Sequence, residues 1–144
     1  MNATETNTFL NRLRIVHSRS LITYLRYAPP WIRKDFHGVG DALETMADEV
    51  QRTADRLGEM ILSGGGEILQ GEFPLEFTGF HDLSIDYLLG ILIQRQEHDI
   101  TTIQECIEPL GSAPLAQALA EESLGAAKGN LDSLRELVAA QSDA

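Results

Sequence analysis

The stretch GGGEILQGEFPLEFTGF, residues 64–80, decides how this chain of 144 residues can fold. It shows neither the 3.6-residue period of a helix nor the two-residue period of a strand. Its three leading glycines end the segment before it, because glycine readily takes the left-handed backbone that closes a helix. At about 3.3 Å per extended residue, the rest can span the roughly 35 Å length of a 25-residue helix. The sequence therefore predicts a long crossover here.

Shorter breaks lie on both sides of this crossover. Pro29 and Pro30 end the first amphipathic segment, and Pro109 with Gly111 separates the last two. Because the outer gaps are short and the middle gap is long, we expect two antiparallel helical hairpins joined by the crossover. The predicted helices cover residues of about 8–28, 39–63, 83–108 and 113–140, while residues 2–7 and 141–144 are expected to fray. Residues 1–144 are thus predicted to form one all-α domain, a four-helix bundle.

The first segment has two contrasting faces. At 100° per residue, the face expected in the core carries both apolar and polar side chains, namely Leu10, Leu13, His17, Leu21, Tyr24, Leu25 and Ala28. The opposite face carries Arg12, Arg19, Arg26 and Arg33. Two interpretations of this row stay open: the arginines pair with acids of the same chain, or they form a stripe that binds a partner.

Polar residues also interrupt the apolar faces of the other helices. Helical wheels place five of them on buried faces: His17, Tyr24, Thr53, Gln96 and Asn130. Leaving such groups unpaired in a core costs about 1–3 kcal/mol each, so they should bond to one another or trap water. We expect a neutral hydrogen-bonded layer, with a small ligand or a single metal ion at His17 as the alternative.

Charge and composition narrow the class of partner and the compartment. Residues 1–34 hold six Lys and Arg against one acid, and residues 35–144 hold five against twenty-one, giving a net charge of −11. Such a surface should repel nucleic acid. No apolar run approaches the roughly 20 residues of a membrane span, and no signal-peptide pattern opens the chain. With a single cysteine, Cys106, expected to be a small buried hydrophobe, the cytoplasm is the predicted location.

Two stretches resemble a known family. LNRLRIVHSRSLITYLRYA (Leu10–Ala28) resembles the first helix of bacterioferritins, and ADRLGEMILSGGG (Ala54–Gly66) resembles the end of the second helix in bacterioferritins and Dps-type mini-ferritins. TIQECI (Thr102–Ile107) and LDSLREL (Leu131–Leu137) fit the same pattern, and Tyr24–Trp31 is similar to a segment of small bacterial ferritin-like proteins. The resemblance implies a ferritin-like four-helix bundle.

The resemblance also implies where a metal centre would lie. Such bundles hold two irons through a Glu from each of two helices and a Glu-x-x-His from each of the other two, since carboxylates neutralise and bridge the cations. Carried onto this chain, the six positions fall on His17, Val50, Thr53, Gln96, Ala127 and Asn130. None is a carboxylate, so the di-iron centre is expected to be degenerate. The haem-binding methionine of bacterioferritins falls on Gln51, so haem is not expected either.

The Dps pattern matches only slightly better. Its metal histidines fall near Tyr24 and on Phe36, beside His37, and its Asp-x-x-x-Glu falls on Gln51 and Asp55. Dps proteins also bind DNA through basic tails, and the opening residues MNATETNTF carry no such tail.

Three functions follow as hypotheses. The preferred one is a non-catalytic ferritin-like bundle without a cofactor, acting as an oligomer or a binding module. The second is an iron-binding, storage or ferroxidase protein that uses acids outside the six positions, with candidates Glu44, Asp48, Asp55, Glu97 and Glu122. The third is a small-molecule binder with a pocket around His17 and Tyr24.

Self-association is expected because apolar residues lie off the core faces. Ile15 and Ile22 lie beside the arginines, and Tyr87, Leu88 and Ile91 lie away from the main stripe of the third helix. A second subunit would cover them in a homodimer or a larger homo-oligomer. The alternative is cover within the chain by the crossover aromatics Phe73, Phe77 and Phe80.

Overall fold

The fold is all-helical, as predicted. The computed structural model describes residues 1–36, 38–80 and 82–142, and this part of the chain holds helices and no strand. In chain order the elements are α1 (Ala3–Ser18), α2 (Leu21–Tyr27), α3 (Val39–Ser63), the 3₁₀ turn η1 (Leu75–Gly79), α4 (Ile85–Ile107), the 3₁₀ turn η2 (Glu108–Leu110) and α5 (Pro114–Ser142).

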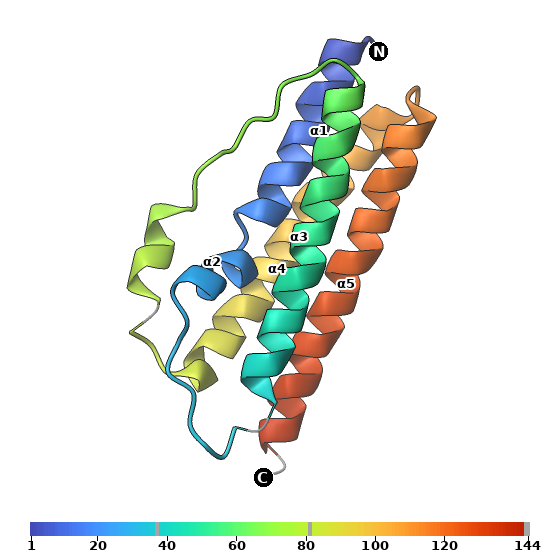
Figure 1. Ribbon diagram of the computed structural model, residues 1–144. Coiled ribbons are helices and arrows are strands. Elements are labelled where there is room, and N and C mark those ends of the chain that lie inside the picture. Colours follow the sequence, from blue (N-terminus) through green and yellow to red (C-terminus); the bar gives the residue numbers. More distant parts are fainter. Residues whose placement is uncertain (37, 81, 143–144) are drawn as a thin grey trace.

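The long helices pack side by side as a bundle (Figure 1). α1 packs chiefly against α3, and α4 packs chiefly against α5. Figure 1 shows the chain leaving the end of α3, running down the outside of the bundle through η1, and entering α4 at the opposite end. This path makes α3 and α4 run in the same direction. Because α1 also contacts α4 and α3 also contacts α5, the four long helices surround one central region.

Glycine ends α3 as the sequence predicts. Gly65 has a φ of +76°, which only glycine adopts without strain. The amide of Gly65 donates to the carbonyl of Leu62 at 3.0 Å, and that of Gly66 donates to Ile61 at 2.9 Å. These are the two bonds of a Schellman motif, which satisfy carbonyls that the end of a helix leaves free. The crossover therefore begins at a well-defined point.

The single helix predicted for residues 8–28 is wrong, because the structure breaks it in two. Ser20 is extended, with φ −71° and ψ 162°, and its hydroxyl accepts a hydrogen bond from the amide of Thr23 at 3.3 Å. The Thr23 hydroxyl in turn donates to the carbonyl of His17 at 3.1 Å. Side chains that hydrogen-bond to nearby backbone compete with a continuous helix. The break lies directly beside His17, and α2 begins with a new register.

The predicted frayed ends also require correction. Residues 3–7 belong to α1, where the side chain of Asn2 accepts the amide of Glu5 at 2.8 Å and so caps the helix. Gln141 and Ser142 belong to α5, while residues 143–144 lie outside the described part.

Two apolar clusters fill the bundle. One joins α2, the first half of α3 and the start of α4, with Phe77 of the crossover and Leu134 of α5. The other joins α1, the second half of α3, the second half of α4 and most of α5. Cys106 belongs to this second cluster and is buried, as expected, and burial raises its pKa. Polar residues occupy the region between the two clusters.

The crossover packs against the outside of the bundle. Phe77 is buried, and Phe73 and Phe80 pack on the same cluster, so the crossover aromatics cover apolar surface as the alternative to self-association proposed. Gly71 has a φ of +67°, and a Cβ there would lie 2.8 Å from Ile15 Cγ2. Glycine thus lets the crossover run close over Ile15.

The other residues expected to lie off the core behave differently. Ile22 and Leu88 belong to the first apolar cluster at 3 % and 0 % exposure, so their predicted position off the core faces was wrong. Ile91 is partly buried against the first cluster, and Tyr87 remains 64 % exposed.

The arginine row is paired within the chain. Arg12 lies 3.1 Å from Glu105, Arg26 bonds to Asp48, and Arg33 lies 3.4 Å from Asp86. Arg19 donates to the carbonyl of Gln70 at 3.1 Å and lies over the Phe73 ring. These contacts favour the first interpretation of the row, in which the arginines pair with groups of their own chain.

Candidate functional site

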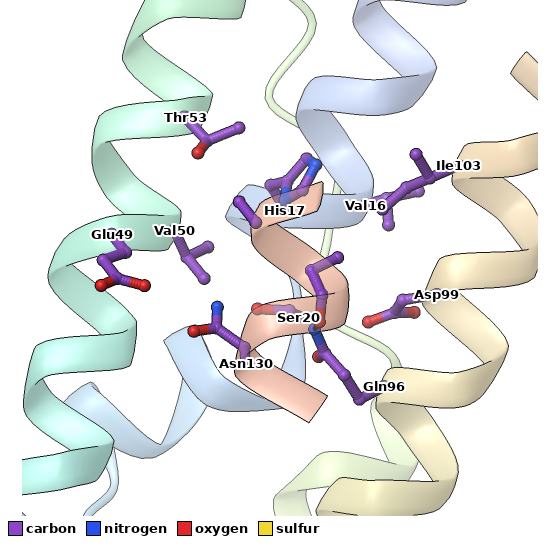
Figure 2. A pocket seen from close by; sticks show the side chains of 12 residues that line it. Val16, His17, Ser20, Glu49, Val50, Thr53, Gln96, Asp99, Ile103 and Asn130 are labelled. Atoms are coloured by element: carbon purple, nitrogen blue, oxygen red, sulfur yellow. Dashed lines mark hydrogen bonds between the residues drawn. The ribbon is translucent and has the colours of Figure 1, made fainter. Parts of the chain in front are cut away.

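A small cavity lies in the middle of the bundle, between the two apolar clusters. Its volume is about 10 Å³, which is room for about one water molecule. Residues from α1, α3, α4 and α5 line it, together with the α2 cap residue Ser20 (Figure 2). The lining consists of Val16, His17, Ser20, Glu49, Val50, Thr53, Gln96, Asp99, Ile103, Ala126, Ala127 and Asn130.

Four of the five residues predicted for a buried polar layer line this cavity. His17, Gln96 and Asn130 are buried at 5 %, 6 % and 4 % exposure, and Thr53 is half-buried. Tyr24 is the exception and a correction: its ring lies 5.3 Å from that of Phe73 and 5.6 Å from that of Phe77. Because the break at Ser20 starts α2 in a new register, Tyr24 meets the crossover instead of the cavity.

His17 is the buried titratable group on α1. Burial lowers its pKa from 6.5 to about 4, because a charged imidazolium loses its hydration there. Its Nε2 is buried and has no hydrogen-bond partner in the described structure. The ring is therefore neutral at physiological pH, and its Nε2 is left unpaired.

Gln96 fixes α4 to α5 at the level of the cavity. Its Nε2 donates to the backbone carbonyl of Ala127 at 3.0 Å, and this bond is buried. The carbonyl end of the same amide stays available as an acceptor.

Two acids and one serine line the cavity without having been predicted there. Asp99 lies three residues after Gln96 on α4, Glu49 directly precedes Val50 on α3, and Ser20 caps α2. The spacing of three residues could have revealed Asp99, since residues three apart share one face of a helix. Figure 2 shows the Asp99 carboxyl and the Gln96 amide both extending from α4 toward Ser20.

Asp99 is held in an unusual protonation state. Burial raises its pKa to about 7, and the nearby positive charge of Arg95 opposes this shift only in part. The carboxyl is therefore protonated in much of the molecule's population at neutral pH.

The six positions that the resemblance assigns to di-iron ligands come together in the structure. His17, Val50, Thr53, Gln96, Ala127 and Asn130 all line this one cavity. They come from four different helices and from residues up to 113 apart in the sequence, between 17 and 130.

The acids considered as alternative iron ligands lie on the outer faces of the helices and outside the cavity lining. Glu44, Asp48, Asp55, Glu97 and Glu122 are all exposed. Asp48 is paired with Arg26, Glu97 lies 3.9 Å from Arg135, and Glu122 lies 2.7 Å from Arg56.

The residues at the Dps and haem ligand positions also have partners within the chain. Asp55 accepts a hydrogen bond from Gln51 at 2.9 Å, and Phe36 is buried in the first apolar cluster under the Arg33 guanidinium. His37 lies outside the described residues. Across the described ranges, no three His, Cys, Asp or Glu side chains gather in an arrangement that could hold a metal ion.

Comparison with known proteins gives no match to any family model, any curated protein or any solved structure. Within the described residues, no helix combines the length and the apolar character needed to cross a membrane.

Proposed function

We propose that this protein is a ferritin-like bundle whose di-iron centre has been replaced by a neutral polar layer, and that it acts non-catalytically as an oligomeric or binding module. The observation that carries the proposal is the convergence of six residues on one cavity. The six positions follow from the sequence resemblance, and the residues at all six line the same small space.

The chemistry of these residues supports the loss of the metal pair. The residues at the six positions are one neutral imidazole, two amides, one hydroxyl and two aliphatic side chains, so these positions offer no negative charge to two cations. Glu49 and Asp99 also line the cavity, but within the described residues they do not gather with His17 into a group that could hold a metal ion. Two metal ions in such sites lie about 3.5–4 Å apart, which needs more room than one water molecule occupies. The cavity of about 10 Å³ suits a single bound water instead.

The two alternative functions have weaker support. An iron-handling role through the outer acids would have to displace the arginines that pair with Asp48 and Glu122. A small-molecule site around His17 and Tyr24 would need space that the cavity lacks, and Tyr24 packs against Phe73 and Phe77 elsewhere.

The proposal also covers the partner of the protein and its location in the cell. Tyr27 and Trp31 are 70 % and 72 % exposed near the end of α2, and large exposed aromatics support contact with a further subunit. A homo-oligomer is therefore proposed. The net charge of −11 favours neither nucleic acid nor an anionic membrane surface as a partner, and the cytoplasm remains the proposed compartment.

Aerobic oxidation of ferrous iron, combined with metal analysis of the purified protein, tests this proposal. We expect an oxidation rate equal to the protein-free rate and less than one iron per chain. Ferroxidase turnover, or more than one bound iron per chain, would show that the protein handles iron and would defeat the proposal.

A further inference from the structure

An apolar groove crosses one end of the bundle, where α1 begins, α3 ends and α5 begins (Figure 1). Two hollows of about 490 and 410 Å³ form it. They are continuous because Met60, Ser63 and Leu115 line both of them. The first hollow lies between α1, α3 and α5, and the second lies between α3 and α5. The groove therefore has room for several side chains of a partner.

The floor of this groove is the outer surface of the second apolar cluster. Leu10, Ala116 and Leu119 are buried members of that cluster, and all three line the groove. Apolar side chains placed here would extend the cluster and leave water, which is favourable in proportion to the apolar area buried. Met60 packs against the same cluster, and its unbranched side chain can adapt to the shape of a partner.

Exposed leucines stand at the groove. Leu115 lines it and is 79 % exposed, and Leu62, which precedes the lining residue Ser63 on α3, is 60 % exposed. Large exposed apolar side chains beside a hollow are typical of a docking surface. The groove thus offers both a space to fill and side chains that gain from being covered.

The segments that form the groove are acidic. Residues 1–10, 55–63 and 113–122 together hold five acids and one arginine, Arg56, which is paired with Glu122 at 2.7 Å. The five acids are Glu5, Asp55, Glu59, Glu121 and Glu122. Complementary charge steers a basic partner to such a surface, whereas like charges oppose docking. A second copy of this chain would bring two acidic ends together, so a basic partner fits better than a second copy.

The dimensions and the walls of the groove favour a helical partner. Its α5 wall runs from Pro114 to Glu122, which is about 12 Å at 1.5 Å per residue. Apolar side chains at positions i, i+4 and i+7 of a helix cover about 10 Å, which matches this length. An extended strand would need backbone partners for its own N–H and C=O groups, and the helices that form the walls already use theirs internally.

We propose that this groove binds a basic amphipathic helix of a partner protein. The apolar side chains at i, i+4 and i+7 of that helix fill the two hollows, and its lysines or arginines face the surrounding acids. The inference names the kind of partner for the binding role proposed above and rests on that role.

A titration of the full chain with labelled synthetic peptides, followed by fluorescence anisotropy, tests the proposal. The probe is a leucine–lysine peptide with leucines at the i, i+4 and i+7 spacing. A scrambled peptide of the same composition and a peptide with glutamate in place of every lysine serve as comparisons. The patterned basic peptide should bind at least about tenfold more tightly than either comparison. Equal binding of the scrambled peptide, or no binding of the patterned peptide at about 1 mM, would overturn the proposal.

Exposed residues supply matched pairs of variants. Leu115→Ser should weaken binding of the patterned peptide by about five- to tenfold, because it removes an apolar contact at the groove. Leu75→Ser is its control, since Leu75 is 84 % exposed on η1, outside the groove lining, and should leave binding unchanged. Glu59→Gln should weaken binding and reduce its dependence on salt, whereas Glu72→Gln in the crossover should not. Equal effects within either pair would overturn the proposal.

Two methionines locate the bound peptide without any variant. Met60 lines the groove, whereas Met46 is 4 % exposed within the first apolar cluster. In an NMR titration the methyl signal of Met60 should shift and that of Met46 should stay. Equal shifts of both signals would overturn the proposal.

Sedimentation shows whether a second copy uses the groove instead. Leu115→Ser should leave the oligomeric state of the chain unchanged. Conversion of an oligomer to a monomer by this variant would assign the groove to a second copy and would overturn the proposal. Failure of the functional proposal would appear as iron turnover, whereas failure here would appear in peptide binding or sedimentation, so the two outcomes are distinguishable.

Discussion

On α4, Leu92 and Gln96 lie one helical turn apart and are similarly buried, at 1 % and 6 % exposure. Leu92 belongs to an apolar cluster, whereas Gln96 lines the polar cavity and bonds to α5. The same helix therefore serves two environments within about 6 Å of its length. Comparison of the two shows that burial alone does not identify a core residue, and that the bundle has a distinct polar centre between two apolar regions.

Leu92→Ala should produce the largest effect, because it removes fully buried methyl groups from a close-packed cluster. The free energy of unfolding should fall by about 2–5 kcal/mol, the usual range for such a truncation. Urea denaturation measures this loss. A loss below 1 kcal/mol would show that the first cluster is loosely packed. It would then not differ in packing from the polar cavity, which would contradict the comparison of Leu92 with Gln96.

Gln96→Ala should cost less, about 1–2 kcal/mol, although it removes a side chain of similar length from the same face. It deletes one buried hydrogen bond to Ala127, and the space it leaves adjoins a polar cavity that water can fill. The comparison with Leu92→Ala under identical conditions is the control. Equal losses for the two variants would mean that the centre is packed like the rest of the core.

Ser20→Ala should destabilise the protein by about 1 kcal/mol, since the Ser20 hydroxyl caps α2 beside the cavity. Ser84 provides a matched control because it precedes α4 in the same extended conformation but makes no capping hydrogen bond. Ser84→Ala should therefore cost less. If both variants lost the same stability, the break at Ser20 would not be held by its cap.

Glu122→Gln should have the smallest effect, under about 1 kcal/mol, because Glu122 and Arg56 form an ion pair with side chains 57 % and 58 % exposed. Its metal content should match that of the unmodified protein. A fall in bound iron in this variant would show that Glu122 binds iron on the outer face of the bundle.

Much of the fold could be predicted from the glycine and proline residues that separate the helical segments of the sequence. Val39–Ser63 was predicted to the residue, because Gly64–Gly66 ends it and a regular apolar stripe fills it. The break at Ser20 was missed, since apolar residues continue at helical spacing across it. A serine three residues before Thr23 was the available signal, and its hydroxyl and that of Thr23 hold the break.

The cavity could be predicted only in part. Helical wheels found His17, Gln96 and Asn130, because each interrupts an apolar stripe on a helix whose register is regular. Tyr24 was misplaced because the break at Ser20 changes the register. Asp99 was missed because an acid beside a stripe normally faces solvent, and only the packing of α1 against α4 shows that this one is largely covered.

A high-resolution crystal structure of protein produced with excess iron, with anomalous data at the iron edge, tests the central claim most directly. We predict a single water within hydrogen-bond distance of His17 Nε2 and no anomalous peak among the four helices. Two anomalous peaks about 3.5–4 Å apart in the cavity would contradict the account, since they would show a working di-iron centre where we propose a neutral polar layer.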